Sequence, residues 1–383
     1  MLDLHVLGTS SARPTSERAV SGSVVSTVEG LVVIDPGEGF QDRFAEARRH
    51  LRSVGGEPRL RPRRVGAVLL SHGHLDHTWG LLPWLQTSGL DGRTEPLEVA
   101  GPVDPSTFER LVKDGCDAAL EGGEPSDLLR QIQQWRALGA TSERLGYPVC
   151  WRLGDVRGGR WARIEDDGSV SPDVEASWAP NGWAKVHVVP VESTHSVASC
   201  GWQILHASGQ GRVEGERLEA LRLTEDERLR LFREGHLDQG DARIELDTYR
   251  GPSTPSLSLV VSGDTAAPGL VVHGQAPDLL VHEATFLEAE QDKAEAHLHS
   301  TCSGAARTAM SSQARVLALT HFSARITDLG VALREATAVL PDGFPCVALV
   351  DGDRLRIDAH GAVEHHRRRD GGWTVTRLAE SRR

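Results

Sequence analysis

The chain has 383 residues and a formal net charge of −12, and 39% of its residues are hydrophobic and 25% charged. This composition is typical of a soluble enzyme with a large core, and the acidic balance argues against broad, non-specific binding to nucleic acid, which depends on neutralising phosphates. No apolar run approaches the roughly 18 residues of a membrane span, and the N-terminus lacks the basic and apolar regions of a signal peptide. We therefore expect a cytoplasmic protein without membrane association.

The cysteines are scattered, odd in number and without paired spacing, which is typical of reduced thiols in a cytosolic protein. They are Cys116, Cys150, Cys200, Cys302 and Cys346. Nearly all positive charge is arginine. Guanidinium groups suit phosphate recognition, but a coding bias towards arginine is the simpler explanation.

The first third of the chain predicts strands mixed with helices, from apolar runs, helical periodicity and Gly/Pro turn signals. The expected elements are strands at 2–7, 20–35, 65–71 and 96–102 and helices at 40–54 and 106–113. Residues 59–64 form a basic linker. Residues 117–182 combine helical pieces at 126–138 with Gly- and Trp-rich sequence, which fits hairpins or an inserted subdomain.

The second half resumes with clear apolar strands. The expected elements are strands at 186–191, 258–264, 279–283 and 316–321, a strand pair at 346–358 and a charged amphipathic helix at 214–234. The charged tail at 364–369 is expected to be peripheral. Strands and helices mix without strict alternation, which indicates an α/β fold of two mixed sheets packed face to face with helices outside.

Four of these apolar runs end in a metal-binding side chain, at His72, Asp264, His282 and His321. Ligands at the carboxyl ends of several strands build a site along one edge of a sheet pair. We therefore expect a functional site at that edge.

The segment Ser71–His77 holds three histidines and one aspartate directly after an apolar run. His72 and His74 are two residues apart, so they can point to the same side of an extended chain and share one metal. Asp76 and His77 follow at a helix start and could hold a second metal. Two metals about 3.5–4 Å apart commonly activate water against a phosphodiester or ester. The alternative is a polar loop that is merely rich in histidine.

Taken in order, the motifs resemble the metallo-β-lactamase superfamily and, within it, ribonuclease Z, the tRNA 3′-processing endonucleases. The segments that carry the resemblance are Leu7–Ser10, the loop 14–19, Ser71–His77, Ser262–Thr265, Val281–Phe286, Ala296–Thr301 and Leu319–Arg325. The resemblance covers roughly 1–110 and 185–350. It implies a four-layer αββα metallo-β-lactamase fold. We expect one domain over 1–383, with an insertion at about 117–182 and an arm-like segment at about 211–250.

The resemblance also implies a ligand set for two zinc ions per chain, with Mn²⁺ or Fe²⁺ as alternatives. The first zinc would be held by His72, His74 and His195, the second by Asp76, His77 and His321, and Asp264 would bridge both. Taken alone, His195 could be a structural histidine and Asp264 a turn aspartate.

For the chemistry, the resemblance implies that a metal-activated hydroxide attacks phosphorus, with Asp76 positioning it. His299 is the expected proton donor to the departing ribose oxygen, and Glu283 is expected to orient His299. The alternatives are a surface histidine at His299, confusion with the nearby His297, and a Glu283 that is merely buried at a strand end.

Two departures from the family pattern bear on the substrate. The loop at 14–19 reads Arg18-Ala19, where the family has Arg-Asn. The segment at 211–250 lacks the Gly-Pro hook and the lysines of the family's tRNA-clasping arm, and it interleaves arginines with acids. A mixed-charge helix is most often a solvated face.

Three interpretations therefore stand beside one another. The first is a tRNA 3′ endonuclease acting on tRNA precursors. The second is a binuclear hydrolase of a small phosphodiester, such as a cyclic nucleotide, or of an ester, because a fold does not determine a function. The third is a non-catalytic metal-binding or interaction protein, which the intact ligand set disfavours. The family commonly forms dimers, so the sequence leaves a homodimer open.

Overall fold

The computed structural model describes residues 1–56, 59–118, 124–211, 213–240 and 242–382. The chain divides into two compact units. The first comprises Met1–His206 and Leu257–Ser381, and the second comprises Ala207–Ser256 with Arg382. The expected insertion at 117–182 belongs to the first unit, and the expected arm at 211–250 belongs to the second. Within these two segments, residues 119–123, 212 and 241 lie outside the described residues.

The larger sheet of the first unit has eleven strands in the order β19-β18-β17-β1-β2-β3-β4-β5-β6-β7-β8. Their bounds are β1 (Leu2–Gly8), β2 (Gly22–Thr27), β3 (Leu31–Ile34), β4 (Val65–Leu69), β5 (Leu97–Pro102), β6 (Val149–Asp155), β7 (Arg160–Ile164), β8 (Val170–Val174), β17 (Arg354–Ile357), β18 (Val363–Arg369) and β19 (Gly372–Ala379). The strands β3 to β6 are parallel.

The smaller sheet has six strands in the order β16-β15-β14-β13-β10-β9. Their bounds are β9 (Val186–Glu192), β10 (Cys200–His206), β13 (Leu257–Val261), β14 (Leu279–Glu283), β15 (Leu317–Thr320) and β16 (Cys346–Ala348). The strands β13 to β16 are parallel, and β9 runs in the same direction because β10 is antiparallel to both of its neighbours. The carboxyl ends of these five strands therefore share one edge.

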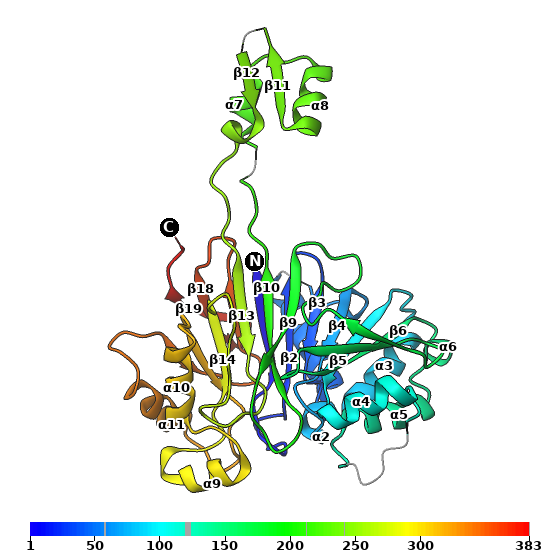
Figure 1. Cartoon of the computed structure of the whole chain (residues 1–383). Coiled ribbons are helices and arrows are strands. Elements are labelled where there is room, and N and C mark those ends of the chain that lie inside the picture. Colours follow the sequence, from blue (N-terminus) through cyan, green and yellow to red (C-terminus); the bar gives the residue numbers. More distant parts are fainter. Residues whose placement is uncertain (57–58, 119–123, 212, 241, 383) are drawn as a thin grey trace. The chain divides into compact units, whose positions relative to one another are not determined.

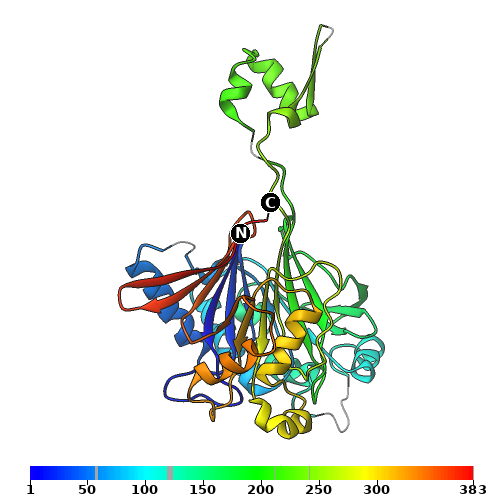
Figure 2. The same cartoon turned by 90° about the vertical axis from the view of Figure 1, so that its left-hand side faces the viewer.

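Alternating side chains on the strands build the four layers. Val25 and Val32 pack between the two sheets, while Val24 and Val33 point to the opposite face. That face is covered by α1 (Phe40–Ser53), α3 (Leu81–Leu90), α4 (Pro105–Asp114) and α5 (Leu128–Ala137). The outer face of the smaller sheet is covered by α10 (Cys302–Ser311) and α11 (Leu329–Thr337). Figure 1 shows the two helical groups on opposite sides of the sheets, and Figure 2 shows α10 and α11 in front of the strands. The predicted αββα architecture is confirmed.

Two sequence expectations need correction. The tail at 364–369 is not peripheral, because it forms most of β18 between β17 and β19, with His365 and His366 buried. The expected strand at 20–35 is a hairpin of β2 and β3. Of the two alternatives for residues 117–182, the hairpins are confirmed, because β6, β7 and β8 are consecutive antiparallel strands that extend the larger sheet. The short helix α6 (Ser142–Leu145) precedes β6.

The second unit contains α7 (Gly215–Glu219), α8 (Glu225–Glu234), β11 (His236–Gln239) and β12 (Ala242–Glu245). Leu218, Leu231, Leu237 and Leu246 form its small core. The single helix predicted over 214–234 is thus two helices. Arg222 has a φ of 50°, which a helix does not allow, and Thr224 with Glu227 forms a capping box that starts α8.

Two negative expectations can be checked against the described residues. None of their helices combines the length and apolar character that a bilayer crossing needs. All five cysteines are free thiols, in agreement with the expectation from their spacing.

Candidate metal centre

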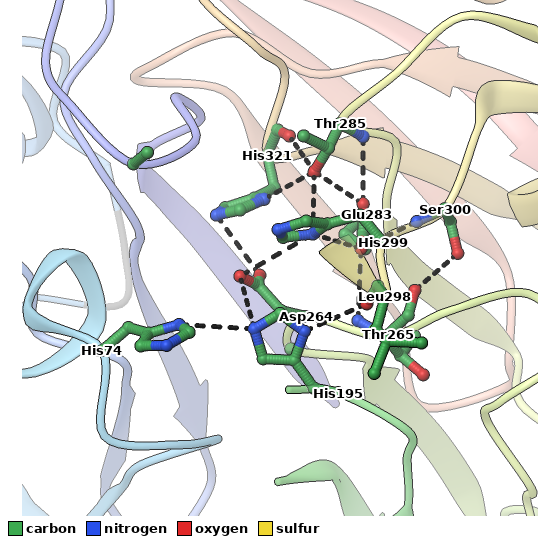
Figure 3. A network of polar contacts seen from close by, with 12 residues as sticks. His74, His195, Asp264, Thr265, Glu283, Thr285, Leu298, His299, Ser300 and His321 are labelled. Carbon is green, nitrogen blue, oxygen red and sulfur yellow. Dashed lines mark hydrogen bonds and ion pairs between the residues drawn. The ribbon is translucent and has the colours of Figure 1, made fainter. Parts of the chain in front are cut away.

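The ends of four strands bring the candidate ligands together. His72, His195, Asp264 and His321 follow β4, β9, β13 and β15 respectively, each by one to three residues. Three further residues complete the site: His74 directly precedes α2 (Leu75–Thr78), and that single turn carries Asp76 and His77. Figure 3 shows His74, His195, Asp264, His299 and His321 converging on one small volume.

The first cluster contains His72, His74, His195 and Asp264, whose potential ligand atoms all lie within 4.8 Å of one another. Nε2 of His72 lies 2.9 Å from Nδ1 of His74, which lies 3.3 Å from Nε2 of His195. The far nitrogen of His195 is 3.0 Å from the carbonyl oxygen of Leu298, which fixes the orientation of the ring.

The second cluster contains Asp76, His77 and His321, again with ligand atoms within 4.8 Å of one another. The Nε2 atoms of His77 and His321 are 3.3 Å apart. Each of these nitrogens lies 3.6 Å from Oδ2 of Asp76. That carboxylate oxygen also accepts a hydrogen bond from the backbone N–H of Ala12 at 2.8 Å, which holds it in place.

Asp264 lies between the two clusters and offers one carboxylate oxygen to each. Its Oδ2 is 3.7 Å from Nε2 of His72 and 3.9 Å from Nε2 of His195. Its Oδ1 is 3.4 Å from Nε2 of His77 and 3.2 Å from Nε2 of His321. Asp264 is buried, and its Oδ1 accepts no hydrogen bond from any of the described residues. A buried carboxylate oxygen that accepts no hydrogen bond lowers the stability of the folded state unless a cation binds to it.

The donor set fits divalent cations. Neutral imidazole and carboxylate are ligands for zinc and related metals, and several ring nitrogens here face one another, where a shared cation would satisfy all of them at once. Burial lowers the pKa of His72, His74 and His195, so these rings are neutral at pH 7. Burial opposes the protonation of His77, but the carboxylates of Asp264, Asp76 and Asp35 outweigh it and raise the pKa of that ring. The site therefore attracts positive charge.

Asp35 is a supporting residue that the sequence reasoning did not identify as part of the site. Its Oδ2 lies 2.9 Å from Nδ1 of His77, and its two oxygens accept hydrogen bonds from the backbone and the hydroxyl of Ser71, both at 2.7 Å. Carboxylates that bond the far nitrogen of a metal-binding histidine orient that ring. The available signal was an acid after the apolar run 31–34, the same pattern that singled out Asp264.

A second polar group lies beside Asp264. Nδ1 of His299 is 2.8 Å from Oε1 of Glu283 and 3.9 Å from Oδ2 of Asp264. Burial disfavours the protonated ring, but Glu283 and Asp264 outweigh it and raise the pKa of His299 to about 9. His297, the rival position, is exposed at the end of α9 (Gln291–His297). His299, and not His297, therefore lies at the site.

Thr285 links these groups to the second cluster, and it too was missed as a functional residue. Its hydroxyl donates to Oε2 of Glu283 at 2.7 Å and lies 3.0 Å from Nδ1 of His321. It thereby couples the orientation of His321 to the fixed carboxylate of Glu283.

The expectation that His282 joins the strand-end ligands is wrong. Glu283 faces the site, and neighbouring residues on a strand point to opposite faces, so His282 points away. It is fully buried, its Nδ1 lies 2.7 Å from the carbonyl oxygen of Glu283, and it belongs to none of the clusters found among the described residues.

A cavity of about 560 Å³ opens beside the first cluster, lined by residues that include His195, Arg110 and Arg157. Arg157 donates a hydrogen bond to the hydroxyl of Thr194 at 3.1 Å, next to His195. This volume falls in the range of ligand-binding clefts, and the arginines supply cations for an anionic substrate.

Comparisons with known proteins agree with this architecture. Residues 16–156 match the Metallo-beta-lactamase superfamily. The chain is 32% identical over 329 residues to a ribonuclease Z of Myxococcus xanthus, covering 85% of this chain and 88% of that protein. It is 28% identical over 357 residues to a ribonuclease Z of Porphyromonas gingivalis, and the alignment covers 93% of this chain and 98% of that protein.

Solved structures with the same fold include the short form of human tRNase Z. It has a TM-score of 0.50 and 19% identity, covering 93% of this chain and 99% of that one. The metallo-beta-lactamase fold protein YhfI of Bacillus subtilis has a TM-score of 0.53 and 13% identity, and the match covers 93% of this chain and 100% of that one. At these identities the likeness concerns the fold.

Proposed function

Because the chain belongs to the ribonuclease Z family of the metallo-β-lactamase superfamily and is a metal-dependent hydrolase, we propose that it is an endoribonuclease that removes 3′ trailers from tRNA precursors. The observation that carries this proposal is the position of Asp264 between two clusters, with His299 beside it. One centre thus combines two cation sites with a proton donor, the parts that phosphodiester hydrolysis requires.

We assign the metal ligands to the two clusters and take the metal to be zinc. His72, His74 and His195 would hold one ion, Asp76, His77 and His321 the other, and Asp264 would contact both. Bound divalent cations at such a centre activate water and neutralise charge on phosphoryl oxygens. The neutral state of the first three rings, which follows from their lowered pKa values, is the state that binds metal.

The remaining residues act on protons and orientation. Asp76, held by the N–H of Ala12, would orient the attacking water. His299 would donate a proton to the departing ribose oxygen, and Glu283 would position that ring through their 2.8 Å contact. The cavity beside His195 would receive the nucleotides next to the scissile bond, with Arg157 near their phosphates.

The test offers the metal-loaded protein a 3′-extended tRNA precursor beside cyclic nucleotides, small esters and bis-p-nitrophenyl phosphate. The proposal expects a cut just past the discriminator base and only slow turnover of the small substrates. Turnover of cyclic nucleotides or esters with the precursor left intact would select the small-substrate hydrolase instead. Asp76→Ala serves as the inactive control on every substrate.

A further inference from the structure

A second cavity in the first unit is lined mostly by arginine. It has a volume of about 420 Å³ and lies where the end of α1, the linker before β4 and the end of α3 meet. Its arginines are Arg48, Arg52, Arg59, Arg61, Arg63 and Arg93, and among the described residues that line it Asp91 is the single acid. We call it the arginine cavity.

Its positive charge is largely left available to a ligand. Across the described part of the chain, no ion pair or side-chain hydrogen bond involves Arg48, Arg52, Arg61 or Arg63. Arg52, Arg61 and Arg63 are exposed. No carboxylate of the described residues forms an ion pair with these four groups, so they present a concentrated cationic surface on a chain whose net charge is −12.

Arg93 makes the cavity rigid. It is buried, and its guanidinium donates to the carbonyl oxygens of Pro62 at 3.2 Å, Val65 at 2.7 Å and Pro96 at 2.7 Å. These bonds fix the backbone of the linker that carries Arg61 and Arg63. Leu51 and Leu60 are buried in the floor. A cationic site that is already ordered loses less entropy when a ligand binds.

The second unit offers a contrasting surface. Four of the seven arginines within 213–256 are ion-paired, in the pairs Arg217–Glu214, Arg233–Glu234, Arg243–Glu245 and Arg250–Asp247, and the other three stand among acidic residues of the same segment. Paired arginines have less charge to offer to phosphates. RNA affinity depends on phosphate neutralisation, so the arginine cavity is the better supported place for it.

The location separates this cavity from the chemistry. The linker reaches the cavity at the start of β4, whereas His72 follows the end of β4. A strand rises about 3.3 Å per residue, so the five residues of β4 alone hold the two places about 13 Å apart. A mononucleotide bound near His72 is too short to reach the arginine cavity as well, whereas a polynucleotide is long enough to contact both.

We propose that the arginine cavity binds backbone phosphates of the RNA substrate at a distance from the scissile bond. This proposal rests on the proposed function. The cavity contributes affinity for the polynucleotide and takes no part in the chemical step.

The experiment compares the metal-loaded wild type with a triple variant, Arg52→Ala, Arg61→Ala and Arg63→Ala. A matched control carries Arg144→Ala, Arg228→Ala and Arg369→Ala, which removes the same charge from exposed positions that likewise form no ion pair with the described residues. Binding is measured by fluorescence anisotropy with a labelled tRNA that has no trailer, over a range of salt concentrations. Cleavage is measured with the 3′-extended precursor and with bis-p-nitrophenyl phosphate.

We expect the cavity variant to bind tRNA at least tenfold more weakly, with a salt slope smaller by about 3, one for each lost phosphate contact. The KM for the precursor should rise by a similar factor, while kcat and the hydrolysis of bis-p-nitrophenyl phosphate stay unchanged. The control should change less than twofold. Replacing the same three arginines by lysine should restore most of the affinity.

Equal weakening in the cavity and control variants would overturn the proposal, because bulk charge would explain it. Unchanged tRNA affinity would also overturn it. Loss of inorganic tripolyphosphate binding with tRNA affinity unchanged would assign the cavity to a small anion instead. Because tRNA binding is measured without cleavage, a protein that binds tRNA through the cavity but leaves the precursor intact would refute the proposed function alone.

Discussion

Glu283 fixes His299 through a 2.8 Å contact between Oε1 and Nδ1, and Glu283 is itself held by four further hydrogen bonds. The backbone N–H groups of Thr265, Thr285 and Ser300 and the hydroxyl of Thr285 all donate to its carboxylate. A buried carboxylate with so many donors is rigid, so the imidazole that it contacts has one orientation. This geometry supports the proposed role of His299 as a positioned acid.

His299→Ala should therefore lower kcat for the tRNA precursor by about 100-fold to 10,000-fold, the usual contribution of a general acid. It should change the hydrolysis of bis-p-nitrophenyl phosphate far less, because p-nitrophenolate leaves without a proton. Glu283→Gln should show the same leaving-group dependence with a smaller loss. Equal losses on both substrates would show that His299 only supports the structure.

Asp264 is expected to set the metal content. Because its two oxygens face different clusters, Asp264→Ala should reduce the metal from two ions per chain to one or fewer. Elemental analysis by mass spectrometry measures this, with circular dichroism to check the fold. Asp247→Ala, at an exposed residue of the second unit, is the control that should retain both ions. Two tightly held ions in the Asp264 variant would refute the assignment of this residue.

Asp35 should matter for metal affinity without touching the metal. Removing a carboxylate that orients a metal-binding histidine typically weakens metal binding by about 10- to 100-fold. Asp35→Asn should produce a loss of that size in a chelator competition titration, because the contact with His77 is weakened. Unchanged affinity would mean that Ser71 and the backbone alone hold the ring.

His5 lies far from the metal centre, and its buried ring is expected to make the protein less stable at acidic pH. Burial lowers its pKa from 6.5 to about 4, against the opposing effect of Asp3. The unfolded chain therefore binds a proton below pH 6.5 that the folded chain resists until about pH 4, so stability falls as the pH falls through this window. This difference between the two pKa values corresponds to a loss of about 3 kcal/mol in the free energy of unfolding.

The measurement is urea unfolding of wild type and His5→Leu at pH 7 and pH 4. Between the two pH values, the free energy of unfolding should fall less in the variant than in the wild type, by about 3 kcal/mol. Identical losses would contradict the assignment of this titration to His5.

The sequence predicted which side chains lie together where each of them follows an apolar run. Asp264 and His321 each follow such a run, and the parallel strands β13 and β15 carry them to the same edge. Asp35 follows the same rule, but Asp-Pro-Gly is also a strong turn signal, and the turn explanation concealed its contact with His77. His282 was misplaced because its neighbour Glu283 occupies the inward-facing position of the strand.

The fold was less predictable where local pattern and tertiary context disagree. The run Glu364–Arg369 looks like a solvated tail, yet pairing with β17 and β19 buries His365 and His366. Charge alone does not reveal that a strand has neighbours on both sides. The division of 214–234 into two helices depends on the cap at Thr224, whose capping-box spacing to Glu227 is visible in the sequence.

Cleavage of a 3′-extended tRNA precursor by the metal-loaded protein tests the central claim most directly. The account predicts one cut, just past the discriminator base, that disappears in Asp76→Ala and after metal removal with a chelator. A precursor that stays intact while the same preparation hydrolyses a cyclic nucleotide or an ester would contradict it.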